Sequence, residues 1–290
     1  TGLGRRSTEH LIAHYKAVGF RKGFNPHPLF DVNFYRRQFS LDGNVDPIAH
    51  YMSRVPHRSR WASPTPFFSV DFYLRSNGDV AKSNISPFEH YIKYGWREGR
   101  KPSAYFCPKW YLSRYQDVAR AGVEPLQHFL TTGIYEGRSP HPLIDIEYYL
   151  AGAPDVAAAG VNPYEHFIVS GDREGRSPHP LFNPSFYRAN GPSLGDAAPF
   201  AHYVEQGAQS LRSPCQAFDA HHYAVHYPNE ADDPLYHLLL AFPQDVRRHF
   251  HPMIDGGYEL LTAKRSAAGT HVLVDYAQFR SNFSVADVAR

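Results

Sequence analysis

The sequence has few sulfur-containing residues, little net charge and no long apolar run. Its 290 residues include 2 Cys and 2 Met, and the formal net charge is +2. The two cysteines, Cys107 and Cys215, do not indicate a disulfide framework and leave the redox compartment open. So small a charge provides no strong field for a phosphate backbone, so nucleic acid is not expected as a partner.

Segments that would direct the chain to a membrane or across it are not found in the sequence. No run of 18 or more apolar residues occurs, so no transmembrane segment is predicted. Residues 1–6 lack the apolar segment of a signal peptide. They also lack an initiator Met, which suggests that the sequence was taken from a longer chain.

What the sequence has in excess is Tyr, Phe, His and Pro, with 20, 20, 18 and 24 copies. Such a bias is typical of a short pattern that has been copied. Two markers recur with a spacing of about 38 residues. The first is a pair of aromatic residues that ends at Tyr35, Tyr73, Tyr111, Tyr149, Tyr187 and Tyr223. The second is a His, usually followed by an aromatic residue, at His14, His50, His90, His128, His166, His202 and His237.

Each repeat contains two expected helix starts, and the first follows an N-cap position. Six of the seven residues at this position suit it, because their side-chain oxygen can accept a bond from an unpaired backbone N–H. These positions are Asp31, Ser69, Cys107, Asp145, Asn183, Asp219 and Asp255. The apolar residue before the cap is expected to pack on the Tyr within the helix as a hydrophobic staple, as in Phe106 and Tyr111.

The second expected helix starts at a residue followed by Pro, as at Asn162-Pro163. Apolar residues then fall on one helix face, as in Tyr164, Phe167 and Ile168. Capping boxes are expected at Ser86/Glu89 and Asn162/Glu165. The residue before this cap should close the corner where the chain enters the helix, at Val45, Ile85, Val123 and Val161. A Gly then follows that ends the helix or admits a neighbouring backbone, at Gly95, Gly133, Gly171 and Gly207.

A lone pair of short helices cannot offset its own ordering entropy, whereas stacked copies cover one another's apolar faces. The sequence therefore predicts an all-α fold of tandem two-helix repeats, arranged as an α-solenoid or a compact helical array. A partial repeat is expected at 1–26, six to seven repeats at 27–264, and a C-terminal cap or the start of a following domain at 265–290. The repeats begin near residues 27, 66, 104, 142, 180, 216 and 252. A short strand is expected at 270–276, after Gly269.

Candidate chemistry is sparse. Neighbouring helices pack about 8–10 Å apart, whereas zinc needs ligands about 2 Å from the ion, so equivalent histidines of adjacent repeats are assigned to packing. The sequence contains no Gly-x-Ser-x-Gly or His-Glu-x-x-His motif. We therefore predict no catalytic residue, no cofactor and no metal site, and we expect the segment itself not to be an enzyme.

A recurrent Glu-Gly-Arg triplet supplies Arg100, Arg138 and Arg176. Such arginines can bind carboxylates or phosphates in a bidentate manner. The favoured alternative is an ion pair or carbonyl contact that ties one repeat to the next. Trp96 and Tyr135 are expected to be exposed aromatic residues, and together with the three arginines they form the candidate interaction surface.

The residues at 128–143, with Asp145, Tyr148-Tyr149 and the segment 154–157 (Pro-Asp-Val-Ala), form a pattern that resembles a known tandem repeat. This repeat occurs in α-proteobacterial proteins, beside glycosyltransferase, rhamnan-synthesis-type or sulfotransferase domains of cell-surface polysaccharide assembly. Similar units also occur in large secreted calcium-binding proteins. The resemblance covers about residues 10–260 and departs at 54–64 and after Gly191. It carries over no catalytic residues.

The resemblance implies a non-catalytic scaffold of a larger bacterial polysaccharide protein, either associated with a glycosyltransferase or part of one. Its partners would be the catalytic domain of the parent chain, polysaccharide-assembly proteins or a glycan. The expected location is the cytoplasm, including the periphery of the inner membrane. One alternative is an extracellular binding module of a secreted repeat protein. A second alternative is a fragment of the enzyme itself, a glycosyltransferase or sulfotransferase.

Overall fold

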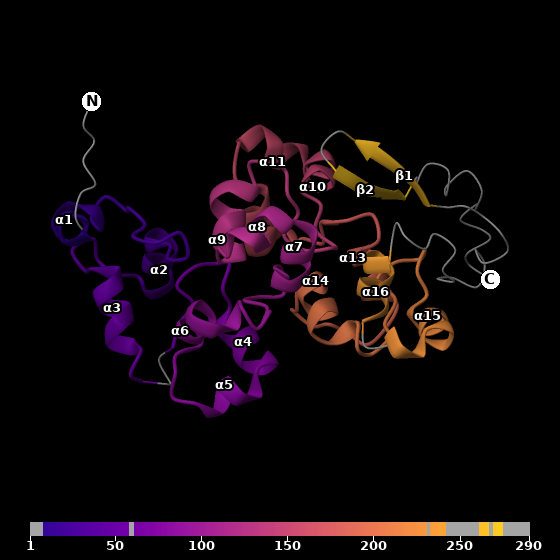
Figure 1. Cartoon of the computed structure of the whole chain (residues 1–290), viewed down its shortest axis with the longest axis horizontal. Coiled ribbons are helices and arrows are strands. Elements are labelled where there is room, and N and C mark those ends of the chain that lie inside the picture. Colours follow the sequence, from indigo (N-terminus) through magenta and orange to yellow (C-terminus); the bar gives the residue numbers. More distant parts are fainter. Residues whose placement is uncertain (1–7, 58–60, 231–232, 242–260, 267–268, 275–290) are drawn as a thin grey trace. The chain divides into compact units, whose positions relative to one another are not determined.

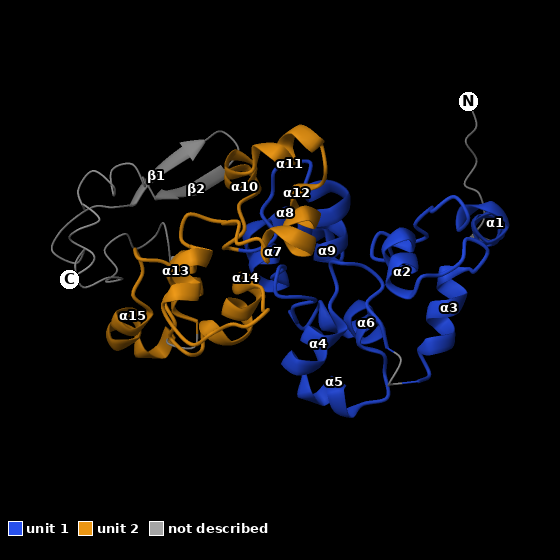
Figure 2. Ribbon diagram, turned by 180° about the vertical axis from the view of Figure 1, so that it is seen from behind, with its two compact units in different colours: residues 1–141 blue, residues 142–290 orange. Residues whose placement is uncertain are grey.

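The computed structural model describes residues 8–57, 61–230, 233–241, 261–266 and 269–274 (Figure 1). The chain divides into two compact units, Thr1–His141 and Pro142–Arg290 (Figure 2). In both units, short helices recur in the order that the sequence repeats. The predicted all-α fold of repeated helices is therefore confirmed. The first half of the expected repeat near residue 252 lies outside the described residues.

The first compact unit begins with α1 (Thr8–His14), which continues into the π-helix η1 (Tyr15–Gly19). The repeat that begins near residue 27 contains α2 (Val32–Phe39) and α3 (Pro47–Arg54). The next repeat contains α4 (Val70–Ser76), α5 (Gly78–Lys82), α6 (Pro87–His90) and η3 (Tyr91–Gly95). The repeat after it has the same order in α7 (Pro108–Arg114), α8 (Gln116–Ala121), α9 (Pro125–His128) and η4 (Phe129–Gly133).

The second compact unit continues the pattern with α10 (Ile146–Gly152), α11 (Pro154–Ala159), α12 (Pro163–His166) and η5 (Phe167–Gly171). The next repeat contains α13 (Pro184–Ala189), α14 (Pro199–His202) and η6 (Tyr203–Gly207). The last described helices are α15 (Ala220–His226), the 3-10 helix η7 (Pro228–Glu230) and α16 (Pro234–Ala241). An antiparallel pair follows, β1 (Leu261–Ser266) and β2 (Gly269–Val274), which places a strand over much of the segment where one was expected.

Three of the repeats contain a third short helix that the two-helix prediction lacked. The Asp-Val-Ala segments form α5, α8 and α11. Each turns one Val into the core, namely Val80, Val118 and Val156. Two of these helices stop at a Gly in the left-handed conformation, Gly122 and Gly160, as expected of helix C-termini.

In the partial repeat and in the four repeats that begin near residues 66, 104, 142 and 180, the second helix changes from α to π geometry half-way along, whereas α3 stays an α-helix throughout. In η4, for example, the N–H of Ile134 donates to the carbonyl of Phe129 at 2.8 Å, five residues earlier. A π-turn widens the helix locally and often marks a place where another group must fit. Here each π segment ends at the recurrent Gly, namely Gly19, Gly95, Gly133, Gly171 or Gly207.

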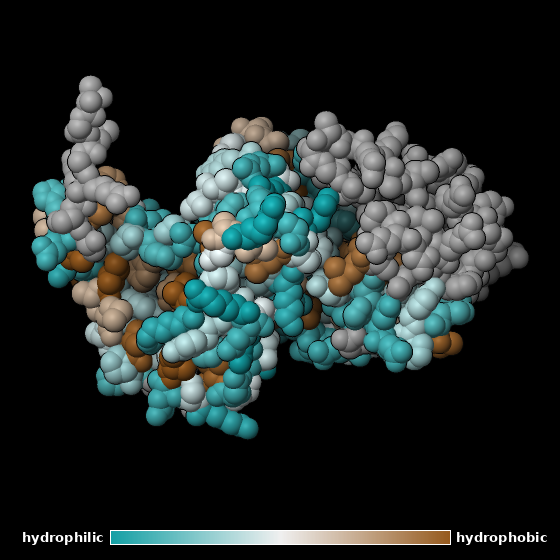
Figure 3. Space-filling view, in the orientation of Figure 1, coloured by the Kyte–Doolittle hydropathy of each residue, from teal (hydrophilic) through white to brown (hydrophobic). Residues whose placement is uncertain are grey.

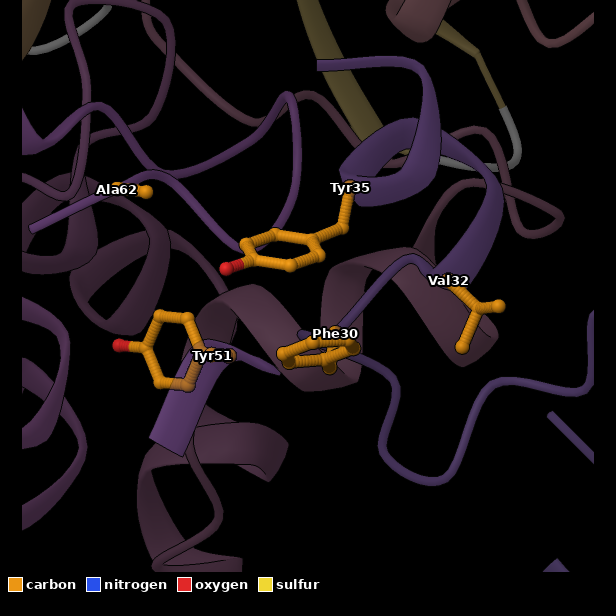
Figure 4. Close-up of a cluster of buried hydrophobic side chains, with 5 residues drawn as sticks. All are labelled: Phe30, Val32, Tyr35, Tyr51 and Ala62. Atoms are coloured by element: carbon orange, nitrogen blue, oxygen red, sulfur yellow. The ribbon is translucent and has the colours of Figure 1, made fainter. Parts of the chain in front are cut away.

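Aromatic side chains make up most of the core of each repeat. The largest fully buried residues are the Tyr and Phe of the repeat, including Tyr73, Tyr111 and Phe106. The expected staple is confirmed, since the rings of Phe106 and Tyr111 lie 5.4 Å apart. Figure 4 shows the equivalent cluster around Phe30 and Tyr35 in the first compact unit.

The predicted caps of the first helices are confirmed wherever the side chain carries a suitable oxygen. The cap bonds are made by Asp31, Ser69, Asp145, Asn183 and Asp219. Cys107 makes none, and Asp255 lies outside the part of the chain that is described. The backbone N–H of the same position donates to a Pro carbonyl at the end of its own repeat, as in Cys107 to Pro140 at 3.1 Å. Each such bond closes the repeat on itself.

Two local predictions about the second helix were wrong. The Ser86 side chain makes no cap bond, so no capping box forms with Glu89, which pairs with Lys93 at 2.6 Å instead. Val45, Val123 and Val161 are exposed rather than packed into the corner before the helix, whereas Ile85 is half-buried. The Pro that follows each cap fixes the chain direction by itself, because its ring restricts φ.

Candidate interaction surface

A Tyr–His pair joins the first and second helices in five of the repeats. The Tyr111 hydroxyl hydrogen-bonds to Nδ1 of His128 at 3.0 Å. The equivalent pairs are Tyr35–His50, Tyr73–His90, Tyr149–His166 and Tyr187–His202, at 2.7–3.0 Å. Burial raises the pKa of Tyr149 to about 12, so the hydroxyl stays protonated at neutral pH. The recurrent His is thus held by a hydrogen bond within its own repeat.

The recurrent Gly lies directly against this hydroxyl. A Cβ atom on Gly133 would overlap the Tyr111 oxygen, and one on Gly171 would overlap the Tyr149 oxygen. Gly95 and Gly207 stand in the same relation to Tyr73 and Tyr187. Sequence analysis predicted that this Gly ends the helix or admits a neighbouring backbone. The group that lies against it is instead the Tyr side chain of the same repeat.

The arginine of each Glu-Gly-Arg triplet is held by two carboxylates. Arg138 forms a bidentate pair with Asp117, at 3.0 and 2.7 Å, and its Nε donates to Glu136 at 2.6 Å. Arg100 binds Asp79 and Glu98, and Arg176 binds Asp155 and Glu174, in the same geometry. The Gly of the triplet adopts a left-handed φ of 69–75°, which turns the chain so that Arg points back to the Asp-Val-Ala helix.

These ion pairs shift the titration of their carboxylates. The hydrogen bonds from Arg138 lower the pKa of Asp117 to about 2, and those from Arg176 do the same to the pKa of Asp155. Burial lowers the pKa of His128, and the nearby Arg138 lowers it further. Because the guanidinium groups already bind carboxylates, they are not presented as free anion sites.

The arginine does not tie one repeat to the next, so that prediction was wrong. Arg138 and Asp117 both belong to the repeat that begins near residue 104. The Asp lies on the short helix that the two-helix prediction lacked, and this helix brings it within reach of Arg. The ion pair therefore closes a single repeat.

Neighbouring repeats are joined instead by the residue that follows the recurrent His. Tyr91 donates its hydroxyl proton to Glu124, the cap of the second helix in the next repeat, at 2.6 Å. Tyr15 likewise donates its hydroxyl proton to Asp46, the cap of α3, at 3.5 Å. Burial raises the pKa of Glu124, against the opposing effect of the bond from Tyr91.

The junction before α14, in the second compact unit, is made by a different pair of groups. The cap position before α14 is Ala198, which has no side-chain oxygen. Asp172 of the preceding repeat accepts the N–H groups of Phe200 and Ala201 at 2.8 and 3.0 Å. Sequence reasoning missed this contact, and the only signal for it was an Ala at a position that elsewhere carries a polar residue.

The two aromatic members of the predicted surface differ sharply. Tyr135 is 84% exposed, as expected, whereas Trp96 is only 8% exposed. The prediction that Trp96 is an exposed aromatic was therefore wrong. Trp96 follows η3 directly and packs into the repeat, and the guanidinium of Arg97 lies 4.2 Å from the centre of its ring.

The second group of histidines lies in the His-Pro loops. His141 and His179 are buried, and the N–H of Leu181 donates to Nδ1 of His179 at 3.1 Å. Burial lowers the pKa of His179, and Asp145 partly opposes that shift. Within the described ranges, no three His, Cys, Asp or Glu side chains gather in a way that could hold a metal ion.

No protein-family model matches this chain, and neither a curated protein nor a solved structure matches it significantly. Among the helices that the structure describes, none has the length and apolar character needed to cross a bilayer. The conclusions about function therefore rest on the residues and their geometry.

Proposed function

We propose that this chain is a non-catalytic helical scaffold of a larger bacterial protein of cell-surface polysaccharide biosynthesis. One observation supports this proposal most. The polar residues that recur from repeat to repeat are held by partners inside the array, such as Tyr111 with His128 and Arg138 with Asp117. Polar residues that bind one another in this way stabilise the fold of the repeat. The exposed residues that differ from repeat to repeat are then available to bind a partner.

The link to polysaccharide depends on the resemblance of residues 128–143 and the segment after them to the α-proteobacterial repeat. In this proposal the array positions a glycosyltransferase-type domain or docks an assembly protein, in the cytoplasm or at the inner membrane. Tyr135, the most exposed of the large apolar residues described, is the preferred contact.

A photo-crosslinking experiment tests the scaffold role. A photoreactive phenylalanine at position 135 is expected to capture a glycosyltransferase domain or a polysaccharide-assembly protein in the source bacterium. The same group at Val225, which is also well exposed, provides the control. Capture of the same proteins from both positions, or of proteins unrelated to polysaccharide, would contradict the proposal.

Two rival functions have separate readouts. Release of nucleotide from UDP-, GDP- or dTDP-sugars by the purified chain would identify it as part of the enzyme. Direct binding of a soluble glycan that Tyr135→Ala abolishes would favour the extracellular binding module. The scaffold proposal expects neither.

A further inference from the structure

The repeat that begins near residue 180 keeps the arginine of the Glu-Gly-Arg triplet but neither of its carboxylate partners. Arg212 lies five residues after the recurrent Gly, as Arg138 does, and both backbone N–H groups donate to that Gly carbonyl at 2.9 Å. Ser210 takes the place of Glu136, and no Asp-Val-Ala helix forms between α13 and α14. Among the described residues, no carboxylate forms an ion pair with Arg212.

The guanidinium of Arg212 has only neutral hydrogen-bond acceptors. Its Nη1 donates to the Pro192 carbonyl at 3.3 Å, and its Nη2 donates to the Tyr187 carbonyl. Its Nε is buried and has no hydrogen-bond partner in the part of the chain that is described. A buried donor without a partner is uncommon in a folded protein and calls for an explanation. Arg212 thus lacks both the acceptor for Nε and the negative charge that the equivalent arginines have.

The turn that aims this arginine is kept although its backbone is strained. Leu211 adopts a left-handed φ of 52°, where the other triplets have Gly99, Gly137 and Gly175. This conformation is disfavoured for a residue with a bulky side chain. Such strain persists where the surrounding structure maintains it, and it is a reason to look for a function. The repeat therefore holds Arg212 in the position of Arg138 without the carboxylates that this position serves elsewhere.

A loop takes the place of the missing helix and lies on the guanidinium. A Cβ on Gly191 would fall 2.5 Å from Nε of Arg212, so the backbone of this loop contacts the side chain directly. A carboxylate that reaches Nε has to displace the turn at Gly191 and Pro192. The bond from Nη1 to Pro192 is long, at 3.3 Å, and a charged acceptor binds a guanidinium more strongly than a carbonyl does. The exchange is therefore favourable for an incoming carboxylate.

We propose that Arg212 binds the carboxylate of an Asp or Glu side chain on a partner protein. The class of ligand follows from the other repeats, in which the same guanidinium binds Asp117 in a bidentate manner and Glu136 through Nε. An external carboxylate would take over one or both of these places. This inference depends neither on the proposed polysaccharide role nor on Tyr135.

The charge of the second compact unit favours a single acidic side chain over a polyanion. Residues 142–290 have 10 Lys and Arg against 17 Asp and Glu, so a polymer with many negative charges would be repelled. Figure 3 shows mainly hydrophilic surface over α14 and α15 of this unit. A partner that docks beside α14 would therefore make polar contacts, of which the ion pair with Arg212 is the strongest.

Nuclear magnetic resonance of the full chain tests the site with N-acetyl-glutamate amide, which carries one carboxylate. The Nε–H signal of Arg212, identified by its loss in Arg212→Lys, should shift during the titration and saturate with a Kd of about 10–100 mM, as expected for one charge-assisted contact. The Nε–H signal of Arg138 should stay in place at constant ionic strength, because Glu136 already binds it.

Two adjacent variants separate a specific site from a general effect of charge. Ser210→Glu supplies the carboxylate that the other repeats place beside Nε, and it should weaken binding of the probe by more than about tenfold. Gln209→Glu adds the same charge at the neighbouring exposed position and should change binding by less than about twofold. Because both positions are exposed, both variants should keep the wild-type circular dichroism.

Several results would overturn the proposal. These are an Arg212 signal that does not move, a shift that Ser210→Glu leaves unchanged, equal weakening by Gln209→Glu, and tighter binding of inorganic phosphate than of the probe. Asp196, an exposed residue of the loop, is the carboxylate of this repeat that could fill the site instead. If Asp196→Asn moves the Arg212 signal without any probe, the chain supplies its own ligand and the proposal is wrong. The crosslinking result at Tyr135 is independent of each of these outcomes.

Discussion

The carboxylate of Asp172 caps a helix that starts in the next repeat, where it accepts the N–H of Phe200 at 2.8 Å. It binds the same two backbone positions that Asp46, Glu124 and Asn162 bind from the cap of their own helix. Because its two partners would otherwise be unpaired at a buried helix start, this contact should contribute strongly to the stability of the second compact unit.

Asp172→Ala is expected to lower the free energy of unfolding by about 1–3 kcal/mol, the cost of leaving buried polar groups unpaired. Adding Ala198→Asp should restore much of the loss, because Ala198 already has the extended conformation of a cap residue. Urea denaturation followed by circular dichroism measures both. A double variant as unstable as Asp172→Ala would show that the helix cap is not what Asp172 provides.

Gly133→Ala should destabilise the chain by about 1–3 kcal/mol, the usual cost of overpacking, because the new methyl group would overlap the Tyr111 hydroxyl. Gly78→Ala is the matched control, since it is a helical Gly of the same compact unit with open space around it. We expect that control to be neutral or slightly stabilising. Adding Tyr111→Phe to Gly133→Ala should recover part of the loss, and the comparison uses thermal unfolding midpoints.

The Arg–Asp pairs should contribute stability that is lost in acid. The pKa of Asp117 and of Asp155 is lowered to about 2, against about 3.9 in an unfolded chain. Their contribution is therefore present above about pH 4 and disappears as the pH falls through about 2. Since both carboxylates are well exposed, solvent screens the pairs and the loss of stability should be small. The double variant Asp117→Asn/Asp155→Asn should have a lower free energy of unfolding than wild type at pH 5 and the same free energy below pH 2. A difference between the two proteins that does not change with pH would show that these carboxylates are not its source.

His179 should make the second compact unit sensitive to mild acid. Burial lowers the pKa of His179, so the folded state holds it neutral while the unfolded state takes up a proton below about pH 6.5. The free energy of unfolding should therefore fall as the pH drops below that value. His179→Ser, which introduces the residue found at the equivalent position Ser103, should flatten this dependence. His221→Ser, at an exposed site, should leave it as in wild type.

Much of the repeat could be predicted because its signals are local. The N-caps at Asp31 and Asp145 depend on a side chain and a backbone N–H three residues apart, and the Phe106–Tyr111 staple on residues five apart. The Asp-Val-Ala helix was missed because it is very short, and short helices depend on tertiary packing more than on propensity.

The candidate surface was predicted less well because exposure is not a local property. Trp96 and Tyr135 are both aromatic residues at the end of a second helix, yet one packs inward and the other outward. Arg138 was recognised as structural, but its partner Asp117 lies 21 residues away. Whether Asp117 comes close to Arg138 depends on where the helices between them turn.

The order of residues along the chain was enough to specify the all-α repeat, its period and its helix starts, since these depend on residues within a few positions of one another. The folded arrangement was needed to specify which groups meet: Tyr with His across two helices, Arg with Asp inside a repeat, and Tyr91 with Glu124 between repeats. Such contacts depend on how the helices are brought together, because hydrogen bonds and ion pairs form over distances of about 3 Å that spacing along the chain does not specify.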